Sequence, residues 1–166
     1  MTAVIVESGD ATADAVRELV HSCSPTALQR RFFLPAPMDA DTVWARYGHY
    51  LLAGPPLGAA VLATADRRPI GLLNLIAVGF QTVELSLLVA DAWQRQRVAT
   101  RLLDAELVKP RWAGWIVQAL VQPDNGPVRS LLRGTRFGTW RLVDRDPSTW
   151  EFALALEPER ALAAAS

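Results

Sequence analysis

Residues 83–103 read VELSLLVADAWQRQRVATRLL, and this stretch decides the fold of the chain. Apolar residues alternate with other residues over its first part, which predicts a strand over 82–90. Apolar residues then recur at helical spacing up to Val108, and Pro110 follows, so a helix is predicted over 97–108. One face of the strand carries Val83, Leu85, Leu87 and Val89, and the other carries Glu84, Ser86 and Leu88.

The turn between this strand and this helix is a candidate anion-binding site. It spans residues 94–100 and reads QRQRVAT. A strand that runs through a tight turn into a helix presents unpaired backbone N–H groups and the positive end of the helix dipole. Together these features hold a phosphate or a pyrophosphate, so the turn indicates a ligand that carries phosphate.

Upstream of this stretch the sequence predicts a group of helices and then two strands. The segment ADRRP separates two apolar runs and is short enough to join antiparallel neighbours. Helix signals come earlier, because Asp10 suits a cap and Ser24-Pro25 suits the cap and first position of a further helix. The expected elements are a strand over 2–7, helices over 10–21, 25–33 and 39–52, and strands over 57–65 and 71–78.

Downstream of the stretch the sequence predicts three more strands and a short helix that Asn125 caps. These elements are a strand over 114–121, a helix over 127–133, and strands over 137–143 and 150–156. The order predicts a single α/β domain, residues 1–166, in which residues 157–166 form a frayed tail. Its sheet is mixed and mostly antiparallel, has about six to seven strands, and is flanked by helices.

Composition describes a globular chain and excludes several classes of function. With 166 residues, 51% of them hydrophobic and 20% charged, an ordinary core needs no disulfide or metal. Cys23 is the only cysteine, and His21 and His49 are the only histidines, so we expect no metal site.

The charge balance and the absence of long apolar runs bear on partners and location. The 17 basic residues equal the 17 acidic ones, which argues against a nucleic-acid partner. No stretch approaches the apolar length of a membrane span, and the N-terminus lacks a signal-peptide pattern. We therefore expect a cytoplasmic protein with no membrane partner.

Three segments resemble the GNAT superfamily of acyl-CoA-dependent N-acyltransferases. Residues 94–99 resemble its coenzyme A motif Q/R-x-x-G-x-G/A, where Gln94 and Ala99 match and Arg97 replaces a glycine. Residues 124–137, DNGPVRSLLRGTRF, are similar to its N-x-P segment, with Arg136 in place of a glycine. The segment SPTALQRRFFLPAP is similar to domains related to bacterial protein-lysine acetyltransferases. The resemblance covers residues 4–156 and implies the GNAT fold.

The resemblance also implies a reaction, which is transfer of an acetyl or other acyl group from coenzyme A to a primary amine. Glu84 corresponds to a glutamate that removes a proton from the amine through water, and backbone N–H groups near Leu88 and Val89 would polarise the thioester. The implied cofactor-binding residues are Leu88, Val89, Gln94, Arg95, Gln96, Arg97, Val98, Ala99, Thr100 and Asn125. The acyl-CoA is a co-substrate, and no metal takes part.

The departures from the family pattern leave alternatives open. In one interpretation the turn keeps right-handed geometry and Arg97 swings outward or donates to the phosphates; in the other its side chain fills the pyrophosphate cradle. Leu132 stands where many members carry an acidic tyrosine. A binding or regulatory module that keeps the fold but binds coenzyme A weakly or does not catalyse is therefore the rival hypothesis. The alternative for Glu84 is that it lies on an exposed patch or pairs with an arginine.

Several further residues have structural interpretations. We expect Asn125 to act as a helix cap besides any role near the cofactor, and Cys23, Tyr47 and Tyr50 to pack. The acceptor is undecided among a protein or peptide lysine, a polyamine, an antibiotic amine and an amino acid, with a slight preference for the protein or peptide amine. Association of two copies through the C-terminal strands, as a homodimer, is likewise undecided.

Overall fold

A computed structural model of the chain describes residues 9–158. The strand expected over 2–7 lies outside the described residues, and so does the expected frayed tail from residue 159 onward. Within residues 9–158 no helix combines the length and the apolar character needed to cross a membrane.

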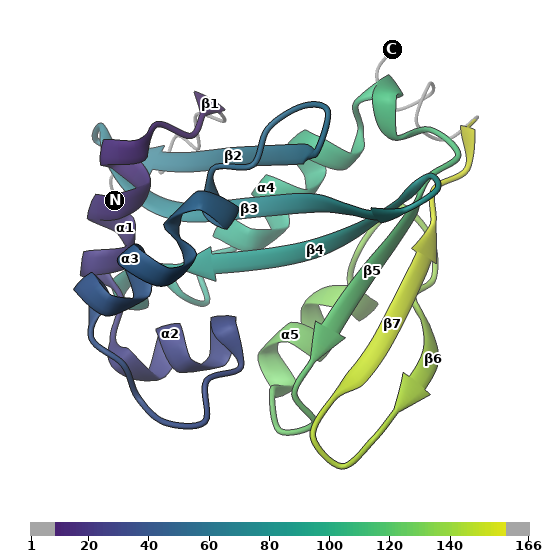
Figure 1. Ribbon diagram of the computed structural model, residues 1–166. Coiled ribbons are helices and arrows are strands. Elements are labelled where there is room, and N and C mark those ends of the chain that lie inside the picture. The colour runs from purple at the N-terminus through teal and green to yellow at the C-terminus, as the bar shows by residue number, and fades with distance from the viewer. Residues whose placement is uncertain (1–8, 159–166) are drawn as a thin grey trace. The chain divides into compact units, whose positions relative to one another are not determined.

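The elements follow the predicted order closely (Figure 1). They are β1 (Gly9–Asp10), α1 (Ala13–Ser22), α2 (Pro25–Phe32), α3 (Ala40–Leu51), β2 (Gly58–Ala65), β3 (Arg68–Gly79), β4 (Thr82–Val89), η1 (Asp91–Trp93), α4 (Val98–Leu107), η2 (Pro110–Trp112), β5 (Ile116–Val121), α5 (Gly126–Arg133), β6 (Arg141–Arg145) and β7 (Trp150–Ala155). The strand expected from residue 137 begins only at Arg141, and Gly138, with a φ of 143°, lies before it.

Side-chain caps explain where the helices begin. The N-caps Ser24 and Asp39 each accept a hydrogen bond from the first turn of their helix, at 3.1 Å from Ala27 N and 2.9 Å from Thr42 N. These two predicted helix starts are confirmed. The prediction that Asp10 caps α1 is wrong, because Thr12 has the extended backbone of a cap and its Oγ1 accepts from Ala15 N at 3.3 Å.

The described strands form one sheet in the order β1-β2-β3-β4-β5-β7-β6. β1 and β2 are antiparallel, β5 is parallel to β4, and β7 is antiparallel to both β5 and β6. Asp66 and Arg67 join β2 to β3 with φ values of 49° and 63°, and a two-residue turn of this kind connects antiparallel strands. The prediction of a mixed, mostly antiparallel sheet is confirmed.

The chain divides into two compact units, and β3 and β4 contribute to both. One comprises Met1–Asn74 with Ser86–Leu102, and the other comprises Leu75–Leu85 with Leu103–Ser166.

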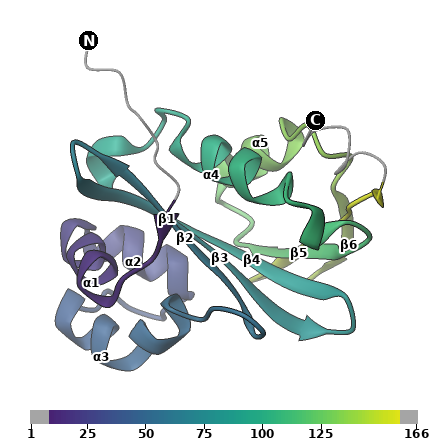
Figure 2. The same ribbon diagram turned by 90° about the horizontal axis from the view of Figure 1, so that it is seen from above.

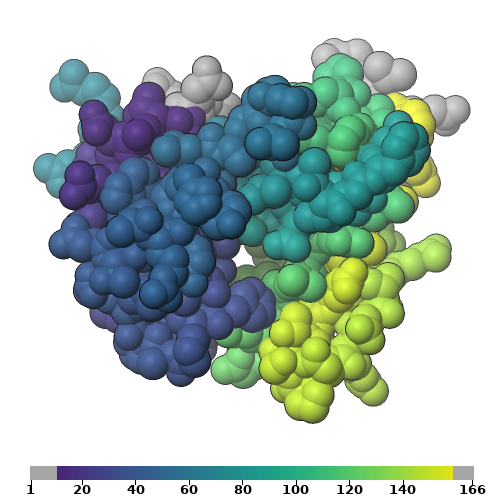
Figure 3. All heavy atoms as spheres, viewed as in Figure 1, coloured from purple at the N-terminus to yellow at the C-terminus, as the bar shows by residue number. Residues whose placement is uncertain are grey.

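In the first unit, helices α1–α3 cover one face of the strands and the start of α4 lies against the other (Figure 2). Leu62, Leu72 and Leu88 belong to one buried cluster with apolar residues of α1–α3. In the space-filling view the purple to blue atoms of these helices lie together as one surface (Figure 3). Gly71, next to Leu72 on β3, faces the opposite layer, where a Cβ added to it would lie 2.8 Å from Val98 Cγ1.

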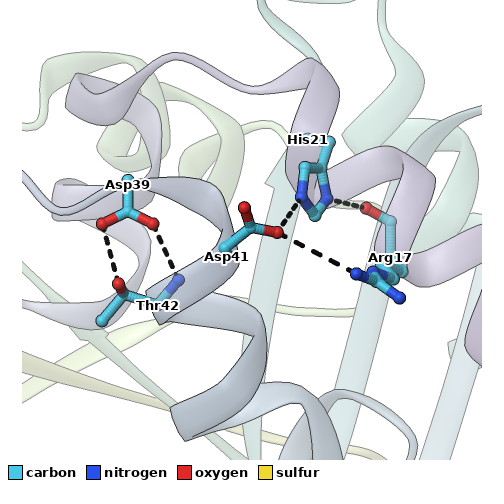
Figure 4. A network of polar contacts seen from close by, with 5 residues as sticks. All are labelled: Arg17, His21, Asp39, Asp41 and Thr42. Atoms are coloured by element: carbon cyan, nitrogen blue, oxygen red, sulfur yellow. Dashed lines mark hydrogen bonds and ion pairs between the residues drawn. The ribbon is translucent and has the colours of Figure 1, made fainter.

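A polar network joins α1 to α3 in the same unit (Figure 4). The ring of His21 lies between two acceptors, with Nδ1 2.8 Å from Arg17 O and Nε2 2.8 Å from Asp41 Oδ1. Arg17 Nη2 also lies 4.0 Å from Asp41 Oδ1. Because both ring nitrogens face acceptors, both bonds are made only when the imidazole is doubly protonated.

The second unit has a small apolar core and a buried carboxylate. Ala119 and Val121 of β5 pack with Leu132 of α5. Glu106 of α4 is 0% exposed, and its carboxylate accepts from Lys109 Nζ at 2.6 Å, from Trp112 Nε1 at 2.9 Å and from Arg111. Two cations and an indole therefore satisfy this carboxylate at the point where α4 ends.

Candidate active site

The turn from β4 into α4, residues 94–100, is left-handed at two positions. Arg95 and Arg97 both have a φ of 62°, whereas Gln96 between them does not have a positive φ. The interpretation that this turn keeps right-handed geometry is therefore wrong, and Arg97 adopts the conformation that a glycine would favour. Each such non-glycine residue costs roughly 1–2 kcal/mol.

The packing of Val98 and two glutamine hydrogen bonds support this geometry of the β4–α4 turn. Val98 is 1% exposed and begins α4 against Gly71, so the chain must reverse within the few residues before it. Gln94 Nε2 donates to Val89 O at 3.3 Å, and Gln96 Nε2 donates to Ala92 O at 2.9 Å. The surrounding structure thus keeps Arg95 and Arg97 in a left-handed backbone conformation that arginine does not favour by itself.

This geometry leaves the start of α4 available to an anion. The N–H of Arg101 is bonded to Arg97 O at 3.0 Å, and the N–H groups of Val98, Ala99 and Thr100 precede the first bond within the helix. The side chains of Arg95 and Arg97 are exposed beside them. Backbone donors, the helix dipole and two exposed arginine residues thus belong to one turn, a combination that suits a phosphate.

Glu84 lies in the second unit, on β4. It occupies the last pair of the β4–β5 ladder, opposite Gln118, and it is half-buried. Within residues 9–158 its carboxylate has no ion pair and no side-chain hydrogen bond, so the alternative that Glu84 pairs with an arginine is not borne out. A half-buried carboxylate without a partner is available to accept a proton.

The N-x-P segment forms the start of α5. Asn125 is the N-cap, and its Oδ1 accepts from Val128 N at 3.4 Å, so its structural role as a cap is confirmed. Leu132, at the position where many GNAT members carry a tyrosine, is 3% exposed and packs under β5. No proton donor therefore stands at this position.

The second arginine that replaces a glycine has a different effect from Arg97. Arg136 has no positive φ, and its Nε donates to Asp104 Oδ1 at 3.2 Å. Its guanidinium lies 5.1 Å from the ring centroid of Phe137. Arg136 thus causes no backbone strain and links α4 to the segment before β6.

The residues expected to pack do so with one exception. Cys23 is buried, as expected, and burial raises the pKa of its thiol to about 12, which disfavours the thiolate form. Tyr47 stacks on Phe32 with ring centroids 4.6 Å apart. Tyr50 is 55% exposed and lies beside His49, so the expectation that it packs is wrong.

Sequence reasoning missed Asp91, Glu106 and Asn74. Asp91 contacts α2, and Asn74 is 1% exposed, with Nδ2 donating to Leu51 O at 3.0 Å. For Glu106 a signal was present, because Lys109 follows at the spacing of one helical turn and Arg111 and Trp112 come next.

Among the residues that the structure describes, no three His, Cys, Asp or Glu side chains gather as a metal site would need.

These features define the fold of the GNAT acetyltransferases, and solved structures of that class superpose on the chain. One is the GNAT domain of PAT from S. lividans, with a TM-score of 0.73, 20% identity and coverage of 91% of this chain and 90% of that chain. Another is PaiA N-acetyltransferase from Thermoplasma acidophilum in complex with coenzyme A, with a TM-score of 0.64, 16% identity and coverage of 90% and 98%. A third is spermidine N-acetyltransferase from Vibrio cholerae in complex with CoA and spermine, with a TM-score of 0.65, 11% identity and coverage of 95% and 98%.

No protein-family model matches the chain, and no curated protein matches it. The fold expected from the strand, turn and helix of residues 83–103 is confirmed by the structural likeness.

Proposed function

We propose that the protein transfers an acyl group, most simply acetyl, from coenzyme A to a primary amine. The observation that carries this proposal is the φ of 62° at Arg97. The β4–α4 turn keeps the backbone that a glycine would provide there, and so it keeps the N–H groups of α4 available to a pyrophosphate. Coenzyme A bound in several solved structures of this fold supports the same co-substrate.

The reaction needs only a few protein groups, because the thioester is already activated. The amine nitrogen attacks the thioester carbonyl, a C–N bond forms, and the C–S bond breaks. In our proposal Glu84 takes the amine proton through a water molecule, and backbone N–H groups near Leu88 and Val89 stabilise the oxyanion. Since Leu132 cannot donate a proton, the departing thiolate takes one from solvent.

The phosphate-binding role falls to residues 94–100. Gln94 fixes the turn through Val89 O, and the backbone of Val98, Ala99 and Thr100 donates to the pyrophosphate. Arg95, Gln96 and Arg97 are exposed, and the two arginines add charge-assisted donors. Asn125 orders the start of α5, and a contact with coenzyme A is a further part of the proposal.

For the acceptor we propose a protein or peptide amine, with lysine as the first residue to examine. The support is the segment SPTALQRRFFLPAP, similar to protein-acetylating domains, together with the likeness to the GNAT domain of S. lividans PAT. A polyamine is the competing acceptor, since the neighbour from Vibrio cholerae was solved with spermine.

The test begins with calorimetric titration of acetyl-CoA and of coenzyme A into the protein. We expect micromolar binding, followed by release of free thiol when a panel of peptides and polyamines is added. Glu84→Gln should lower turnover by about 100-fold or more without loss of binding. Glu18→Gln on the exposed side of α1 is the matched control and should be neutral. No binding at millimolar ligand would refute the proposal.

The rival function is a binding module that has kept the fold without catalysis. Leu132, buried where a tyrosine would serve as acid, is the observation that favours it. This function predicts weak or no binding of coenzyme A, no thiol release on any amine, and an unchanged result with Glu84→Gln.

Two further expectations concern assembly and location. The five residues of β6 are all exposed at one end of the strand order, and this strand is where we propose that a second copy pairs. Light scattering on the purified protein distinguishes a dimer from a monomer. A cytoplasmic location is proposed from the sequence pattern and is checked by cell fractionation.

A further inference from the structure

The carboxylate of Asp91 is bonded to the start of helix α2. Ser24 N donates to Asp91 Oδ1 at 2.8 Å, and Ser24 Oγ donates to Asp91 Oδ2 at 2.7 Å. Both oxygens of one carboxylate therefore bind a single residue that lies 67 positions away in the sequence. Resting on the function proposed above, we propose that Asp91 is a positioning residue, which through Ser24 holds the β4–α4 turn in the geometry that binds acyl-CoA.

Asp91 acts on the turn because it begins the segment that leads into it. Asp91 is the first residue of η1, and its carbonyl accepts from Gln94 N at 3.3 Å, where the turn starts. Trp93 packs against the buried cluster of α1–α3. The segment is thus attached to the helical layer at Asp91 and at Trp93 before it reaches the two left-handed arginines.

The left-handed arginines are the reason why such an attachment matters. A non-glycine residue keeps a positive φ only where the surrounding structure over-determines it. On one side of Arg95 and Arg97, Val98 is fixed against Gly71. On the other side the bonds from Ser24 to Asp91 supply the corresponding constraint, and they are of the stronger, charge-assisted kind.

The contact is separate from the cap of α2. Ser24 Oγ accepts from Ala27 N at 3.1 Å, and this bond does not involve the carboxylate of Asp91. A substitution at Asp91 therefore leaves the cap in place, and its effect falls on the segment that leads to the turn. Asp91 touches neither the reacting atoms nor the proposed phosphate donors, so its role is one of positioning.

The chain offers a matched control in Asp39 (Figure 4). Asp39 Oδ1 accepts from Thr42 N at 2.9 Å, and Asp39 Oδ2 accepts from Thr42 Oγ1 at 2.7 Å. The same type of carboxylate thus makes the same two bonds to one residue, at the start of α3 and without a contact to the turn. Asp39→Asn measures what the loss of such a contact does to stability alone.

The experiment titrates coenzyme A calorimetrically into the wild type, Asp91→Asn, Asp39→Asn and Ser24→Thr. We expect the Kd to rise about fivefold in Asp91→Asn and to stay within about twofold of wild type in the other two. Turnover at saturating acyl-CoA should be unchanged in Asp91→Asn. Without ligand, the hydrogen-bonded amides of Gln94 and Arg101, which stand on either side of the left-handed residues, should exchange faster in Asp91→Asn and not in Asp39→Asn.

The outcomes separate this inference from the proposed function. An equal Kd for Asp91→Asn and wild type, or an equal rise in Asp39→Asn, refutes the positioning role and leaves the acyltransferase proposal intact. Failure of the wild type to bind coenzyme A refutes both. If Asp91→Asn does not fold, Ser24→Gly carries the same test, since it removes one of the two bonds and glycine is tolerated at a cap.

Discussion

Gly71 of β3 and Val98, the first residue of α4, lie so close that a Cβ on Gly71 would be 2.8 Å from Val98 Cγ1. The same Cβ would lie 3.3 Å from Leu102 Cδ1 and 3.5 Å from Leu88 O. The absence of a side chain at residue 71 thus lets α4 approach the strands, and this approach determines where the β4–α4 turn must end.

Gly71→Ala should therefore destabilise the protein and disturb the turn. Overpacking of a filled core costs about 1–3 kcal/mol, and we expect a loss of that size in urea unfolding. Because α4 has to move away from β3, the affinity for coenzyme A should fall as well. Gly54→Ala is the control, since a Cβ there meets nothing within 4 Å. Wild-type stability in Gly71→Ala would show that α4 adjusts without cost.

Arg97→Gly should separate the stability of the turn from its function. Glycine relieves the positive φ but gains freedom in the unfolded chain, so we expect a net stabilisation of about 0.5–1 kcal/mol. If the guanidinium donates to phosphate, the Kd for coenzyme A should nevertheless rise several-fold. Arg46→Gly, in the middle of α3, should instead destabilise by about 1 kcal/mol. Tighter binding by Arg97→Gly would support the interpretation that the arginine fills the cradle.

Local signals explain which parts of the fold were predictable from the sequence. The caps Ser24 and Asn125 were predicted because a cap depends on residues within one helical turn of it. The β4–α4 junction was found because the hydrophobic period changes abruptly there. The cap of α1 was predicted wrongly because Asp10 and Thr12 both carry side chains that suit a cap. Only the backbone conformation of Thr12 shows which of them is the cap.

The remaining features depend on contacts between distant parts of the chain. The left-handed conformation of Arg97 lies next to the contact of Val98 with Gly71, and no local property of arginine indicates it. The contact of Asp91 with Ser24 spans 67 residues and joins a loop to a helix cap. For the candidate site the sequence therefore identified which residues to consider, whereas the geometry of the turn came only with the tertiary structure.

Glu106→Gln should destabilise the end of α4. Burial raises the pKa of Glu106, but hydrogen bonds from Lys109, Trp112 and Arg111 outweigh it and leave the pKa lowered. A lowered pKa contributes stability above the ordinary value of the group, and that contribution is lost as the pH falls through the lowered value. We expect Glu106→Gln to cost about 1–3 kcal/mol at neutral pH and to reduce the loss of stability in acid.

The control for Glu106→Gln is Asp104→Asn, which removes the exposed pair with Arg136. Exposed ion pairs contribute about 0–1 kcal/mol, so this variant should resemble the wild type in urea unfolding at neutral and at acid pH. If the two variants were equally stable, the buried carboxylate would have no special importance.

His21 should make the contact between α1 and α3 sensitive to pH. The hydrogen bond to Arg17 O, followed by that to Asp41, raises the pKa of His21 above its ordinary value of 6.5. When the folded-state pKa is raised, the added stability is fully present below the ordinary pKa of the group. It disappears as the pH rises through the folded-state pKa. Unfolding measured from pH 5 to pH 9 should therefore show stability falling above about pH 6.5. His21→Gln and Asp41→Asn should reduce this loss of stability above about pH 6.5. The control His49→Gln leaves both His21 contacts in place and should show the same loss as the wild type. If the loss persists in His21→Gln, another group causes it.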